Sequence, residues 1–148
     1  MARRDEYLTR SNRRARRGAT ILEMALTLGI LLSLTFGTVE FGYFFYVKNT
    51  VQGAAREGAR LAITPTASNA DVSTMVNNSL QAAGFKPADF TTTVKVAGTV
   101  ANCNTAVAGQ PVEVSVQATW GTVGLRPLGL ISSTKTVLGV ATMRKEGT

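Results

Sequence analysis

The longest hydrophobic stretch of the chain lies near its N-terminus. Residues 24–39 carry no formal charge, and the apolar character extends over 19–47 if Glu23 and Glu40 are tolerated. A helix of about 20 apolar residues crosses a bilayer core of about 30 Å. The pattern therefore predicts one membrane-spanning helix, with its transmembrane part at about 22–47, and leaves no room for a second.

Helix-forming residues continue beyond this stretch, and the first strong breaker is Pro65. A helix over 19–63 would be about 67 Å long at about 1.5 Å per residue, so its part at 48–63 would project from the membrane. Small residues recur there at a four-residue spacing: Ala54, Gly58 and Ala62. Residues this small either let another helix pack closely against the long helix or form the surface on which the protein's own head packs.

A polar hinge at 64–69 separates this helix from a small head at 70–148. Within the head, Val72, Val76 and Leu80 have the spacing of a one-sided helix over 70–83, and Gly84 is a suitable C-terminal stop.

Alternating apolar and polar residues predict the strands of the head. They occur at 90–97, at 111–120 and at 133–143, while 121–131 forms either a short helix or a packed loop. We expect an α+β fold: the long N-terminal helix and a head of one further helix and a three-stranded antiparallel sheet. A head this small buries little apolar surface by itself. We therefore expect its sheet to pack on the outer half of the long helix, which would supply the second layer.

Charge is concentrated before the apolar stretch. The chain has a net charge of +7, and seven of its sixteen basic residues precede Gly18. Basic residues close to a membrane span stay on the cytoplasmic side, so we expect 1–18 to be cytoplasmic and unstructured in isolation, and the head to be translocated. This arginine-rich segment is either a leader that sets the topology and is then removed, or a plain cytoplasmic tail that is attracted to anionic lipid. The remaining basic residues are scattered, which argues against nucleic-acid binding.

The segment also has the order of a secretory signal peptide, a basic region followed by an apolar one. Signal peptides, however, have an apolar region of about 7 to 15 residues that ends in a small-residue cleavage site. Here the apolar run continues into the aromatic residues at 41–46. The length favours a retained membrane helix.

Glu23 stands near the start of this helix, where a carboxylate is unfavourable. Insertion scales give a cost of roughly 2.5 to 3.5 kcal/mol for such a charge at the helix centre. Glu23 therefore either has a partner or function, or extends to the cytoplasmic interface.

Four motifs resemble a known family. Gly18 follows two arginines and precedes Glu23 by five residues, which resembles the class III prepilin cleavage site of type IV pilins. Together with FGTVEFG at 36–42 and AAREGAR at 54–60, the segment resembles the TadE-like pseudopilins of tight-adherence (Flp-type) systems. The ending VATMRKE at 140–146 is also similar to that family.

The resemblance implies a mechanism. A prepilin peptidase would cut between Gly18 and Ala19, and Glu23 would pair with the new α-amino group of a neighbouring subunit. The implied partners are this peptidase, the major pilin and other pseudopilins, and the inner-membrane assembly platform. The chain would be a single-pass protein of the bacterial inner membrane, with a periplasmic or extracellular head, and would serve as a minor or priming subunit.

Some residues depart from the family pattern or fit it ambiguously. Ala19 is not the phenylalanine that begins many mature pilins, and Cys103 has no second cysteine for an intramolecular disulfide. Cys103 is either a free thiol or a link between two chains. Glu40 is either a solvated charge at the outer interface or a functional one.

Catalytic chemistry has no support in the sequence. The chain has no histidine, one cysteine and no phosphate-binding glycine loop, so we expect no enzyme activity, cofactor or metal site. The alternative to a pseudopilin is an uncleaved single-pass anchor that presents a periplasmic binding module.

Overall fold

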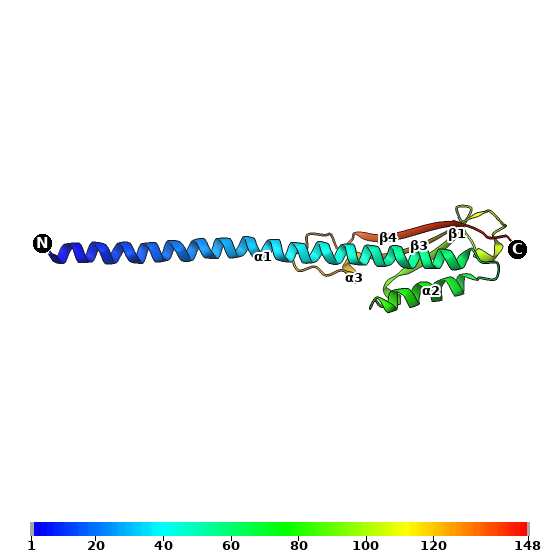
Figure 1. Ribbon diagram of the computed structural model, residues 1–148, viewed down its shortest axis with the longest axis horizontal. Helices are drawn as coiled ribbons and strands as arrows, with labels where there is room; N and C mark the ends of the chain where they lie inside the picture. Colours follow the sequence, from blue (N-terminus) through cyan, green and yellow to red (C-terminus); the bar gives the residue numbers. More distant parts are fainter. Residues whose placement is uncertain (1, 148) are drawn as a thin grey trace. The chain divides into compact units, whose positions relative to one another are not determined.

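The computed structural model describes residues 2–147, with side chains from Thr20 onward. The chain divides into two units, Met1–Val39 and Glu40–Thr148. Helix α1 (Ala2–Ala62) runs through both (Figure 1). The remaining elements belong to the second unit: α2 (Asn69–Ala82), η1 (Pro87–Asp89), β1 (Thr91–Val96), β2 (Thr99–Val100), η2 (Cys103–Thr105), β3 (Pro111–Thr119), α3 (Trp120–Val123) and β4 (Thr136–Arg144).

The long helix was predicted over 19–63, and α1 begins earlier, at Ala2. The leader, which we expected to lack regular structure in isolation, is therefore part of the helix. Arginine is a good helix former, and no proline occurs before Pro65, so the local sequence contains nothing that would stop the helix. The C-terminal end of α1, Ala62, lies within one residue of its predicted position.

Helix α2 confirms the second predicted helix. Ser68 and Asp71 form a capping box, in which the Ser68 side chain accepts from the Asp71 N–H while the Asp71 carboxylate accepts from the Ser68 N–H. Gly84 follows with φ +83°, a conformation that favours glycine at the end of a helix.

The sheet has four antiparallel strands in the order β2-β1-β3-β4, so the prediction of three strands was wrong. The missed strand, β2, has only two residues, too few for an alternating pattern. It pairs with β1 across a tight hairpin whose two central residues, Ala97 and Gly98, both have positive φ, as a type I′ turn requires.

The core lies where α1 and α2 meet the sheet. The inward face of β3 supplies Val112, Val114 and Val116, all fully buried, and the outer part of α1 supplies Val51, Ala55 and Ala59 to the same cluster. The expectation that the sheet packs on the outer half of the long helix is therefore confirmed.

Two polar contacts join α1 to β4 and to the residues that follow it. The Gln52 side chain donates to the Val140 carbonyl at 2.7 Å and accepts from the Val140 N–H at 3.3 Å, which pairs the open edge of β4. The buried Lys145 ammonium donates to the carbonyls of Ala62 (3.2 Å) and Thr64 (2.7 Å). It thereby satisfies carbonyls at the C-terminal end of α1 and complements the helix dipole.

Candidate functional site

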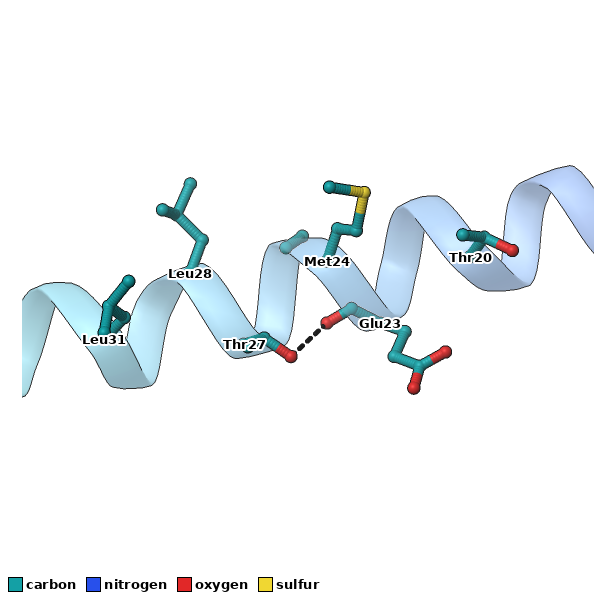
Figure 2. A pocket seen from close by; sticks show the side chains of 7 residues that line it. Thr20, Glu23, Met24, Thr27, Leu28 and Leu31 are labelled. Atoms are coloured by element: carbon teal, nitrogen blue, oxygen red, sulfur yellow. Dashed lines mark hydrogen bonds between the residues drawn. The ribbon is translucent and has the colours of Figure 1, made fainter.

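The first unit presents Glu23 on an exposed helix surface. Figure 2 shows its carboxylate pointing away from the helix axis, in a different direction from Met24 and Leu28. The Thr27 hydroxyl donates to the Glu23 backbone carbonyl at 2.9 Å. Within the described part of the chain, the carboxylate itself has no hydrogen-bond or salt-bridge partner. The side chain is exposed, so a group from another molecule can reach it.

The helix surface around Glu23 is apolar and uncovered. Leu22 is 74% exposed and Leu34 is 69% exposed, and the other large apolar residues of this stretch are exposed as well. The segment Thr20–Ala62 contains a stretch long and apolar enough to cross a membrane. Uncovered leucines on a long helix are the surface that a lipid bilayer covers.

Hydroxyl side chains within this stretch bond to their own helix. Ser33, Thr35 and Thr38 each donate to the carbonyl four residues earlier, at 2.9, 2.8 and 2.9 Å. A hydroxyl that satisfies itself in this way needs no water, so these residues do not prevent the helix from entering hydrocarbon.

The predicted cleavage site, Gly18 and Ala19, lies on the backbone of α1. The side chains of 1–19 fall outside the described residues, and the cut between Gly18 and Ala19 stays a prediction.

Glu40 is fully buried at the start of the second unit, so the reading of it as a solvated charge was wrong. Its two carboxylate oxygens accept from backbone N–H groups of the connection after α3, from Ile131 at 2.8 Å and from Leu128 at 3.2 Å. These partners lie 88 and 91 residues away along the chain, and no local pattern signals them. Glu40 holds a remote loop against α1.

An aromatic cluster occupies the next turns of α1. The rings of Tyr43 and Phe44 lie 6.1 and 5.2 Å from that of the buried Trp120, and Tyr46 lies 5.8 Å from Phe85. The Tyr46 hydroxyl donates to the Ala83 carbonyl at 2.9 Å. These rings attach α1 to α3 and to the residues that follow α2.

The small residues at four-residue spacing face the chain's own head. Ala54 and Ala62 are buried, and a Cβ added at Gly58 would meet Val76 of α2 at 2.7 Å and Val114 of β3 at 3.2 Å. Of the two alternatives, the structure supports close packing within the chain.

Cys103 is buried in η2, and its thiol donates to the Ala67 carbonyl at 3.2 Å. Burial raises the pKa of the thiol, which keeps it neutral and poorly reactive. This placement favours a free thiol over a link between chains.

Among the residues from Thr20 onward, no group of three or more His, Cys, Asp or Glu could hold a metal ion.

Comparison with known proteins connects residues 18–60 to a family. The family model described as TadE-like protein matches residues 18–60, which confirms the resemblance predicted from the sequence. The match begins at Gly18 and contains Glu23, Glu40 and the alanine-rich motif. Neither the curated proteins nor the solved structures contain a match to the chain.

Proposed function

We propose that this chain, whose residues 18–60 belong to the TadE-like family, is a pseudopilin: a minor or priming subunit in the assembly of a tight-adherence pilus. The family suggests a pilus-associated protein, and the subunit role is the proposal. The observation that carries it is Glu23, a carboxylate without a partner among the described residues, on an uncovered apolar helix within the family match.

The proposed mechanism begins with removal of the leader. A prepilin peptidase cuts after Gly18 and leaves Ala19 with a free α-amino group, which is protonated near neutral pH because its ordinary pKa is about 7.7 to 8.0. The Glu23 carboxylate of one subunit then pairs with the amine of its neighbour. Pairing removes much of the cost of holding both charges in lipid, so it favours assembly.

Burial in the head refines the proposed membrane span. Glu40 and Val47 are both fully buried by the second unit, which leaves no room for lipid around them. The span that we propose therefore covers 20–39, before the first of these buried residues, instead of 22–47. A helix over 20–39 has about 20 residues and a length of about 30 Å, which matches the hydrocarbon core.

The mass of the membrane-extracted protein tests this proposal. Expressed with its prepilin peptidase, the chain should lack residues 1–18 and begin at Ala19. Gly18→Phe should block processing, whereas Ala15→Phe, a matched change within the leader, should not. A mature protein that retains its leader is the result expected of an uncleaved anchor with a periplasmic binding module, and it would overturn the pseudopilin role.

A further inference from the structure

The connection between α3 and β4 exposes an unusual number of leucines. Leu125, Leu128 and Leu130 are 49%, 42% and 57% exposed, within a segment of six residues. Arg126 is the only charged residue among them, and no acidic residue occurs between Gly121 and Arg144. Closely spaced exposed leucines are typical of a surface that another phase or molecule covers.

Hydrogen bonds hold this loop against α1 at a defined residue. The Glu40 carboxylate accepts from the N–H groups of Leu128 and Ile131, and the Arg126 side chain donates to the Ile131 carbonyl at 3.3 Å. Glu40 directly follows the uncharged run at 24–39 in the chain. The leucines are therefore fixed beside the residue at which the proposed membrane span ends.

The adjacent residues have the composition of a membrane interface. Tyr43 and Tyr46 follow Glu40 on α1, and Tyr46 is 46% exposed. Tyrosine and tryptophan are enriched where a membrane protein passes from hydrocarbon to water.

We propose that the loop at 125–130 is a second membrane-contacting element, whose leucines enter the boundary between headgroups and acyl chains of the outer leaflet. Arg126 would extend to the phosphate of an anionic lipid, and the positive charge of this segment complements that surface. This inference rests on the proposed membrane span. Lipid is favoured over a protein partner because Glu40, which holds the loop, directly follows the proposed span in the chain, and because the one charge of the loop, on Arg126, is of the sign that an anionic headgroup attracts.

Accessibility measurements with a nitroxide spin label test the location of the loop. The full chain, with Leu130→Cys in a Cys103→Ser background, is labelled and placed in vesicles of phosphatidylethanolamine and phosphatidylglycerol. Leu125→Cys is a second variant, should one position disturb the fold. Leu31→Cys in the span and Val107→Cys, which is 66% exposed elsewhere in the head, are the lipid and water references.

The rates at which the label collides with oxygen and with a water-soluble nickel complex show whether it lies in lipid, in water or against another protein. In lipid, the oxygen-to-nickel accessibility ratio at positions 125 and 130 should exceed that at 107 several-fold and approach that at 31. High nickel accessibility at both loop positions would place the loop in water, and low accessibility to both reagents would place it against another protein; either result overturns the proposal. If position 31 is also accessible to nickel, the membrane span itself is wrong, and the proposed function fails with it.

Discussion

Glu23 and Glu40 are both glutamates on helix α1, but their surroundings differ. Glu23 is exposed on an apolar surface, and in the described part of the chain its carboxylate has no partner. Glu40 is fully buried and accepts two backbone hydrogen bonds. A buried carboxylate that accepts hydrogen bonds stabilises the fold to which it belongs. A carboxylate in lipid that has no hydrogen-bond or charge partner favours association with a molecule that supplies one. Glu40 therefore stabilises the head, whereas Glu23 is the residue on which the proposed assembly mechanism depends.

Substitution of Glu23 should weaken assembly. Glu23→Ala removes the proposed partner of the neighbouring amine, and a loss of about 1.4 kcal/mol per contact corresponds to about tenfold weaker association. Pilus yield in sheared fractions should fall, while leader removal and membrane insertion stay normal. Thr27→Val, which changes a nearby polar residue without removing a charge, is the control. Normal pilus yield with Glu23→Ala would contradict the pairing mechanism.

Substitution of Glu40 should loosen the loop after α3. In Glu40→Gln the side-chain oxygen can accept only one of the two N–H bonds, because the other terminal atom is itself a donor. Hydrogen exchange of the Leu128 and Ile131 amides should become faster. Glu57→Gln, at an exposed position on the same helix, should leave both rates unchanged. Unaltered exchange in Glu40→Gln would show that the loop is held by other contacts.

At the scale of the element, the outer half of α1 is a layer of the head, and its earlier part is long and apolar enough to cross a membrane. Its outer half supplies buried residues to the core, its Gln52 pairs the edge of β4, and its end is capped by Lys145. Close approach requires small residues: a Cβ added at Gly139 of β4 would lie 2.6 Å from the Val51 carbonyl oxygen of α1. The backbone of a helix cannot yield locally as a side-chain end can.

A methyl group at Gly139 should therefore separate α1 from β4. We expect Gly139→Ala to lower the free energy of unfolding by about 1–3 kcal/mol, the usual cost of overpacking. The control is Gly53→Ala on α1, where an added Cβ meets nothing within 4 Å and should stabilise the helix by about 0.5–1 kcal/mol. Thermal unfolding followed by circular dichroism measures both. Equal stability of the two variants would mean that α1 and β4 are not in close contact.

The contribution of the α2 N-terminus to folding stability should depend on pH, because it involves the Asp71 carboxylate. Hydrogen bonds from the Ser68 backbone N–H and hydroxyl hold the pKa of this carboxyl below its ordinary value of 3.8. Because the folded pKa is the lower one, its contribution to stability is complete above pH 3.8 and is lost as the pH falls through the folded pKa. At neutral pH, Asp71→Asn should therefore lower the Tm.

The difference in Tm between the wild type and Asp71→Asn should shrink at acid pH and disappear below the folded pKa. Asp89→Asn, which removes another carboxylate of the head, controls for the change in net charge. A Tm difference that persists unchanged to strongly acid pH would mean that the charge of Asp71 does not stabilise the helix start.

At the scale of the whole molecule, the distribution of charge predicts its orientation. Seven arginines precede Gly18, so this end should stay in the cytoplasm and the head at 70–148 should lie outside the inner membrane. Protease added to intact spheroplasts should digest the head and leave a fragment containing the span. A cytoplasmic protein of the same cells, intact until lysis, is the control. Protection of the head in intact spheroplasts would contradict this topology.

Local periodicity was sufficient for the long elements. The extent of α2 and the approximate positions of β1, β3 and β4 followed from patterns that repeat every two or every 3.6 residues, and the end of α1 followed from the breaker Pro65. Strand β2 could not be predicted in this way, since two residues show no period. The family resemblance also rested on contiguous motifs, and the match to residues 18–60 confirmed it.

The sequence by itself determined one long apolar helix with an acidic residue near its start, a basic leader and a small α+β head, because these features depend on neighbouring residues. Only the tertiary structure decided the roles of Glu40, Gln52 and Lys145, whose partners lie 81 to 91 residues away. It also decided that Gly58 faces the chain's own head. Sequence shows that a polar or small residue is present, but its partner depends on which segments the fold brings together.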